Sequence, residues 1–183
     1  MTAPEYIQLK AYARQDGFFL ALLWIASFGA YIAGFKHQVL GLTAILLAVF
    51  SPFYVLGRLR HFRDEGREGV ISFTRSYVYT IFVFFYGAVL LAVVHFLYFN
   101  YIDDGYLMSE FVNAISTEEG HQLLVQYGMT EIVDESLSEM SHIRPIDYAL
   151  NLLTINIMLG FILGVPIGLL TYRNNNQTMI SDK

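Results

Sequence analysis

Charged residues, a histidine and glycines lie close together in one stretch of the chain, residues 58–73 (RLRHFRDEGREGVISF). His61 stands three residues before Asp64 and four before Glu65, so a helix would place these side chains on one face. A carboxylate beside a histidine can orient the imidazole as a general base. The alternative is a solvated helix end, in which the arginines pair with Asp64, Glu65 and Glu68. Surface ion pairs of this kind are common, and this second interpretation is favoured.

Arginine offers a different chemistry in the same stretch, because its planar guanidinium binds phosphate oxygens in pairs. The candidates for binding a lipid headgroup phosphate are Arg58, Arg60, Arg63 and Arg67. In that hypothesis His61 or Asp64 would assist the arginines. No set of catalytic residues is predicted.

Three polar side chains fall inside long apolar stretches: His95, Asn151 and Asn156. Ionisable residues inside a membrane are costly and tend to be functional. An asparagine amide, in contrast, commonly forms a hydrogen bond between two helices, which stabilises their contact by about 0.6 kcal/mol. Contacts between helices are the favoured interpretation. A small polar path past His95 and Asn156 is the alternative.

The chain has five histidines and no cysteine, which excludes disulfides and thiolate chemistry. No two histidines stand three or four residues apart, so a metal ion would need ligands from distant segments. His121 and His142, with nearby acidic residues, are the candidates for such a site. We predict no metal ion and no cofactor.

Composition places these residues in a membrane protein. Hydrophobic residues make up 55% of the 183 residues and charged residues only 15%, which is too apolar for a soluble domain of this size. A bilayer core about 30 Å thick requires roughly 20 helical residues. Four runs without Asp, Glu, Lys or Arg meet that length, at about residues 17–35, 39–57, 76–101 and 148–172.

Helices are the expected form of these runs, because backbone groups in lipid must be satisfied within the segment. The sequence therefore predicts an all-α integral membrane protein, with four transmembrane helices in an antiparallel bundle and one membrane domain over residues 1–183. Only Lys36, His37 and Gln38 separate the first two runs, which predicts a tight hairpin. Residues 174–183 are predicted to be disordered.

The distribution of lysine and arginine predicts the orientation. Nine of these residues lie in the N-terminal segment, the link between the second and third runs, and the tail, against Lys36 and Arg144 on the other side. Positive residues beside spans are retained in the cytoplasm. Both termini are therefore predicted to be cytoplasmic, in a multi-pass membrane protein.

The insertion at residues 102–147 would then lie outside the membrane, and it contains ten acidic residues against the single Arg144. Its apolar residues recur at helical spacing, which predicts two or three short amphipathic helices that cap the bundle. Gly105, Gly120 and Gly128 are the expected turn points. Such acidity argues against nucleic acid as a partner.

Small residues at every fourth position mark two helices for close packing. They are Ala26, Ala30 and Gly34 in the first run, and Gly160, Gly164 and Gly168 in the fourth. These stripes can face another helix of the same chain or a second copy. The first arrangement is favoured for a four-helix bundle.

The charged stretch also resembles the signature of a four-span membrane family from Bacteroidota, catalogued as domain of unknown function 4199. The matching residues are Phe62, Arg63, Asp64, Gly66, Gly69, Ile71, Ser72 and Phe73. The resemblance implies a similar fold and an inner-membrane location. It implies no reaction and no catalytic residue.

A non-enzymatic accessory or scaffold that binds another membrane protein is the leading hypothesis for function, because packing signals outweigh catalytic ones. The second hypothesis is a lipid-handling protein that binds lipid phosphate through the arginines. The third is a small channel or transporter. Membrane lipids are the expected surroundings, with another membrane protein or a second copy as the expected partner.

Overall fold

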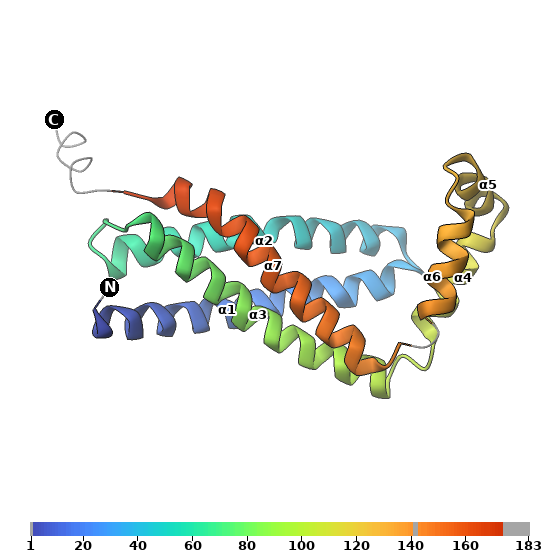
Figure 1. Ribbon diagram of the computed structural model, residues 1–183, viewed down its shortest axis with the longest axis horizontal. Helices are drawn as coiled ribbons and strands as arrows, with labels where there is room; N and C mark the ends of the chain where they lie inside the picture. The colour runs from blue at the N-terminus through green and yellow to red at the C-terminus, as the bar shows by residue number, and fades with distance from the viewer. Residues whose placement is uncertain (1, 141–142, 174–183) are drawn as a thin grey trace. The chain divides into compact units, whose positions relative to one another are not determined.

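The computed structural model describes residues 2–140 and 143–173, which form seven α-helices and no strand (Figure 1). The helices are α1 (Ala3–Gly34), α2 (Gln38–Gly66), α3 (Phe73–Tyr101), α4 (Tyr106–Ser116), α5 (Glu118–Gln126), α6 (Thr130–Met140) and α7 (Pro145–Thr171). Four of them, α1, α2, α3 and α7, are long and apolar enough to cross a membrane. These helices confirm the all-α class and indicate a multi-pass membrane protein. The predicted disordered tail, 174–183, lies outside the described residues.

The chain divides into two compact units. The first contains Met1–Ala92 and Leu152–Lys183, and the second contains Val93–Asn151. Helices α3 and α7 each contribute residues to both units. The charged stretch belongs to the first unit and the acidic insertion to the second.

Helices α1 and α2 form an antiparallel hairpin that turns at residues 35–37, as the short separation of the first two runs predicts. With increasing distance from the turn, earlier residues of α1 contact later residues of α2. Near the turn, a Cβ on Gly34 would lie 2.7 Å from the Cα of Gly41, so the backbones touch there. Farther along, the Trp24 indole Nε1 donates a hydrogen bond of 2.7 Å to the Ser51 hydroxyl.

Both helices continue beyond the predicted apolar runs. Residues 58–66, for which the sequence favours a helix end, are the last turns of α2. Leu59 and Phe62 from these turns are fully buried, and the Phe62 ring stacks on the Tyr79 ring at 5.1 Å between centroids. Only residues 67–72 link α2 to α3, and Gly69 turns this link with φ +81°. Burial of apolar side chains therefore keeps the charged stretch helical.

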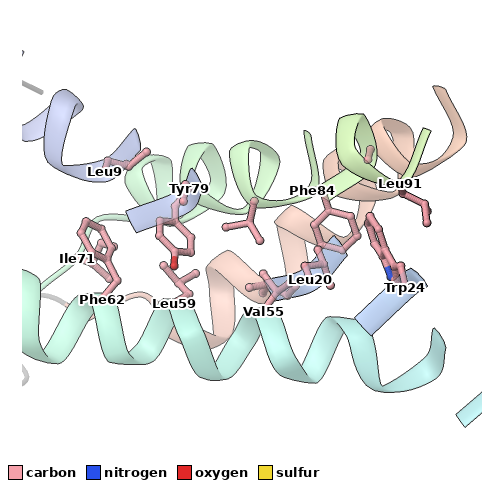
Figure 2. Close-up of a cluster of buried hydrophobic side chains, with 14 residues drawn as sticks. Leu9, Leu20, Trp24, Val55, Leu59, Phe62, Ile71, Tyr79, Phe84 and Leu91 are labelled. Carbon is pink, nitrogen blue, oxygen red and sulfur yellow. The ribbon is translucent and has the colours of Figure 1, made fainter. Parts of the chain in front are cut away.

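The core of the first unit is a row of buried side chains contributed mainly by α1, α2 and α3 (Figure 2). It includes Leu9, Leu20 and Trp24 of α1, Val55, Leu59 and Phe62 of α2, and Tyr79, Phe84 and Leu91 of α3. Ile167 of α7 is also buried in this cluster. The row extends from Leu9, well before the first apolar run, so the helices remain packed outside that run.

The second unit contains α4, α5 and α6, which are amphipathic and agree with the predicted two or three helices. Two of the three predicted glycine turns are present, since Gly105 and Gly128 have φ of +79° and +64°. The predicted turn at Gly120 is wrong. It lies in the first turn of α5, where its N–H donates to the Thr117 hydroxyl at 3.1 Å and satisfies a free donor of the helix start.

Candidate functional site

Asp16 is the most buried charged side chain among the described residues, with 1% of its surface exposed. Its Oδ1 accepts a hydrogen bond of 2.6 Å from the Arg58 Nε of α2, and its Oδ2 accepts one from the Tyr79 hydroxyl of α3. The Tyr54 hydroxyl donates to the Asp16 backbone carbonyl at 3.4 Å. Both carboxylate oxygens are thus satisfied by different helices, as a buried charge requires. We name these four residues the Asp16 cluster.

The Asp16 cluster lies at the edge of the apolar region. Asp16 immediately precedes the run 17–35, and Arg58 immediately follows the run 39–57. At a rise of about 1.5 Å per residue, Asp16 is roughly 27 Å along α1 from Gly34, close to the thickness of a bilayer core. The charge-free run that follows Asp16 is therefore long enough to cross a bilayer core, and the cluster lies at the end of that run.

A second group of charges ties the start of α1 to the link between α2 and α3. Glu5 accepts hydrogen bonds from Arg67 Nη2 at 2.9 Å and from Arg75 Nη2 at 2.8 Å, one on each carboxylate oxygen. It also accepts the backbone N–H of Thr2 at 2.8 Å, which completes a capping box at the start of α1. We name Glu5, Arg67 and Arg75 the Glu5 cluster.

Arg63 binds the end of α7. Its guanidinium makes two hydrogen bonds to the Asp64 carboxylate, at 2.7 and 3.0 Å, and its Nη1 donates to the Thr171 carbonyl at 3.2 Å. The last carbonyls of a helix lack partners within the helix, so this contact satisfies one of them. Ile71 and Arg173 exchange backbone hydrogen bonds of 3.2 and 3.1 Å next to it. The charged stretch thus joins the last turn of α7 to the link.

The four arginines predicted to bind lipid headgroups have different environments. Arg58, Arg63 and Arg67 each bond to a carboxylate of the same chain. Arg60 is exposed. His61 lies 3.0 Å from Glu65, the helical pair that the spacing predicts, and both side chains are well exposed. Exposed pairs of this kind contribute little to stability.

The three polar residues predicted inside the apolar runs have different environments. His95 is buried in the second unit and stacks on Phe99 with ring centroids 6.3 Å apart. Asn151 of the same unit is exposed. Asn156, in the first unit, donates its amide to the Leu152 carbonyl of its own helix at 2.8 Å.

The glycine stripe of α7 faces aromatic side chains of α3 in the first unit. A Cβ on Gly160 would lie 2.6 Å from the Phe84 Cβ, and a Cβ on Gly164 would lie 2.9 Å from the Tyr77 ring. Gly168 has the same relation to the Phe73 ring at 3.0 Å. A side chain at Gly160 would overlap Phe84, and at Gly164 and Gly168 the facing aromatic rings would have to shift to admit one.

The small residues of α1 are placed differently from one another. Gly34 packs against Gly41 at the hairpin turn, Ala30 is partly buried, and Ala26 is exposed. The α1 stripe therefore contacts α2 at its end nearest the turn and leaves Ala26 accessible.

Sequence reasoning missed Asp16, Glu5 and Tyr79. The signal for Asp16 was present in the spacing of Leu9, Ala13, Asp16 and Leu20, which are all buried on one face of α1. A charged residue on a buried helical stripe must have a partner. The identity of the partner, 42 residues away, has no comparable signal in the sequence.

Hydrogen bonds of acidic side chains stabilise the local structure of the acidic insertion. Asp103 accepts the Leu107 N–H at 3.1 Å and caps the start of α4. The Asp147 carboxylate accepts two hydrogen bonds from the Arg144 guanidinium, at 2.8 and 2.9 Å, and thereby raises the pKa of Arg144 above its usual value. Among the described residues, no three His, Asp or Glu side chains are grouped to hold a metal ion. His142 lies outside those residues.

A family model described as "Protein of unknown function (DUF4199)" matches residues 15–173. No curated protein and no solved structure matches the chain. The matched range contains the whole Asp16 cluster and the end of α7, whereas Glu5 precedes it. The match confirms the family resemblance that residues 62–73 indicate.

Proposed function

Because the chain belongs to the family described as Protein of unknown function (DUF4199), whose description names no activity, we propose a function from its geometry. The protein is a non-enzymatic accessory or scaffold that binds another membrane protein through α4, α5 and α6. One observation carries the proposal: these helices are amphipathic, yet none of their described residues is buried. An amphipathic helix in water normally covers its apolar face.

The exposed apolar side chains of these helices, and of the link between α5 and α6, are Phe111, Val112, Leu123, Val125, Tyr127, Met129 and Ile132. Apolar surface of this extent, surrounded by polar residues, is typical of an interaction site. The segment Tyr106–Met140 carries seven acidic residues and no lysine or arginine. Charge complementarity therefore favours a partner surface that combines apolar residues with lysine and arginine.

The proposed setting is the bacterial inner membrane. We place both termini in the cytoplasm and the acidic segment on the opposite side, as a cap on an antiparallel bundle of four spanning helices. The distribution of lysine and arginine supports this orientation. Hydrogen bonds within the Asp16 and Glu5 clusters support a structural role for that end of the bundle.

The test is purification of the full chain from its native membrane in a mild detergent. We expect a partner protein in fixed stoichiometry. The triple variant L123S/V125S/Y127S removes exposed apolar surface without touching a buried residue, and we expect it to lose the partner. The matched control N113S/Q122S alters exposed polar residues of the same helices and should retain it.

Two results would contradict the proposal. The first is a wild-type chain that purifies alone under conditions that preserve other membrane complexes. The second is turnover of a lipid-linked substrate by the isolated protein, because an enzyme needs no partner for that activity.

A further inference from the structure

A groove of about 420 Å³ lies between α1 and α2 beside the Asp16 cluster. Its lining residues are Phe19 and Leu23 of α1, and Tyr54 and Arg58 of α2. Each pair is spaced four residues apart and so lies on one face of its helix. The groove is accessible from the surface, since Phe19 is 48% exposed. The groove is open to the surface, so a ligand in it would be only partly enclosed by protein.

The groove has two apolar side chains on its α1 side, and an arginine and a tyrosine on its α2 side. Because α1 and α2 are antiparallel, Arg58 and Phe19 lie toward the edge of the apolar region, and Tyr54 and Leu23 lie one turn deeper. Arg58 immediately follows the charge-free run 39–57, which is long enough to cross a bilayer core. A ligand that fits this arrangement has an anionic group joined to a hydrocarbon chain.

Arg58 is prepared to hold an anion. Its Nε is bonded to Asp16, and this bond fixes the plane of the guanidinium. The side chain keeps 32% of its surface exposed and also lines the groove. Tyr79 donates a hydrogen bond to the other oxygen of Asp16, so that oxygen also has a partner. A guanidinium held in place in this way loses less freedom on binding than a free arginine.

We propose that this groove binds one phospholipid molecule, with the phosphate on the terminal amino groups of Arg58 and one acyl chain along Phe19 and Leu23. Arginine binds phosphate oxygens through paired hydrogen bonds, and basic pockets between membrane helices bind lipid headgroups. Of the four arginines that the sequence predicts to bind lipid phosphate, this proposal uses only Arg58. It does not depend on the docking of a partner by α4–α6.

The site can be tested by native mass spectrometry of the full chain in detergent. Three probes are added separately: phosphatidylglycerol, diacylglycerol with the same acyl chains, and inorganic phosphate. We expect one phosphatidylglycerol per chain. Diacylglycerol, which lacks the phosphate, should bind about tenfold more weakly. Inorganic phosphate, which lacks the acyl chains, should not be retained.

Two variants locate the site while keeping a positive charge at position 58 opposite Asp16. Leu23→Trp fills the groove and should abolish retention of phosphatidylglycerol, whereas Leu22→Trp, at the neighbouring exposed position, should retain it. Arg58→Lys keeps the charge but loses the planar fork, and should weaken binding about fivefold. Arg60→Lys is its matched control and should bind as the wild type does.

Several outcomes would overturn the proposal. Equal retention of diacylglycerol would show a purely apolar groove, and retention of inorganic phosphate would show a site for free anions. Wild-type binding by both Leu23→Trp and Arg58→Lys would place the lipid elsewhere on the protein. Thermal unfolding of each variant in detergent separates loss of the lipid from loss of the fold.

Discussion

In the Asp16 and Glu5 clusters each carboxylate lies against one or two arginines from another helix or from the link between α2 and α3. In α4–α6 the acidic residues have no lysine or arginine within the segment, and none of the described side chains is buried. The first region therefore uses charge to join segments of one chain. The second presents charge of one sign together with exposed apolar groups. Acidic residues thus hold segments of the same chain together in one unit and, in our proposal, bind a partner protein in the other.

The largest effect should come from breaking the Asp16–Arg58 pair. Asp16→Asn removes the charge that compensates Arg58 and weakens two hydrogen bonds at a buried site, so we expect a loss of about 3 kcal/mol in the free energy of unfolding. Asp64→Asn makes the same chemical change at a half-exposed site bonded to Arg63, and should cost less than about 1 kcal/mol. Unfolding by denaturant in mixed micelles measures both.

A double variant decides whether the pair acts as a unit. D16N/R58Q removes both charges and should be more stable than the sum of the two single losses predicts, by at least about 1 kcal/mol. Strict additivity would mean that Asp16 and Arg58 stabilise the bundle independently, and the contrast with the acidic segment would then lose its basis.

The second effect concerns the glycine stripe that packs α7 on α3. Gly160→Ala places a methyl group 2.6 Å from the Phe84 Cβ and should cost about 1–3 kcal/mol, because the helices must separate. Gly29→Ala is the matched control. Its added methyl meets no atom within 4 Å, and alanine is the better helix former by up to about 1 kcal/mol. The two changes should therefore differ in sign, as thermal unfolding in detergent can show.

If Gly160→Ala were as stable as Gly29→Ala, the contact between Gly160 and Phe84 would not be close. The stripe would then be free to meet a second copy, the alternative that the sequence leaves open. A shift in oligomeric state on substitution would support that alternative directly.

Much of the fold is visible in the sequence because lipid imposes simple limits. Charge-free runs of about 20 residues predict four helices, and the three residues between the first two runs predict their hairpin. The sequence favours a helix end at residues 58–66 but not the extension of α2 to Gly66, because the absence of charge defines a span and does not define where a helix ends. Burial of Leu59 and Phe62 extends α2 past that limit.

The candidate site was less predictable. The arginines were identified as phosphate ligands from their type, but Arg58, Arg63 and Arg67 have carboxylate partners in the same chain. The partners Glu5 and Asp16 belong to the N-terminal segment, tens of residues away. Pairing over that distance depends on which helix faces meet, and residue type alone does not reveal it.

The smallest effect on stability should follow a change in the acidic segment. Val125→Ser exposes no buried group, because Val125 is already 58% exposed, so the free energy of unfolding should stay within about 0.5 kcal/mol of the wild type. The same change at Val55, which is fully buried in the first unit, leaves a cavity and a hydroxyl in the core and should cost about 2 kcal/mol. Denaturant unfolding of the two variants compares the regions directly. A loss above about 1 kcal/mol for Val125→Ser would mean that the chain itself covers this apolar face, and a docking role for α4–α6 would then have no surface to act through.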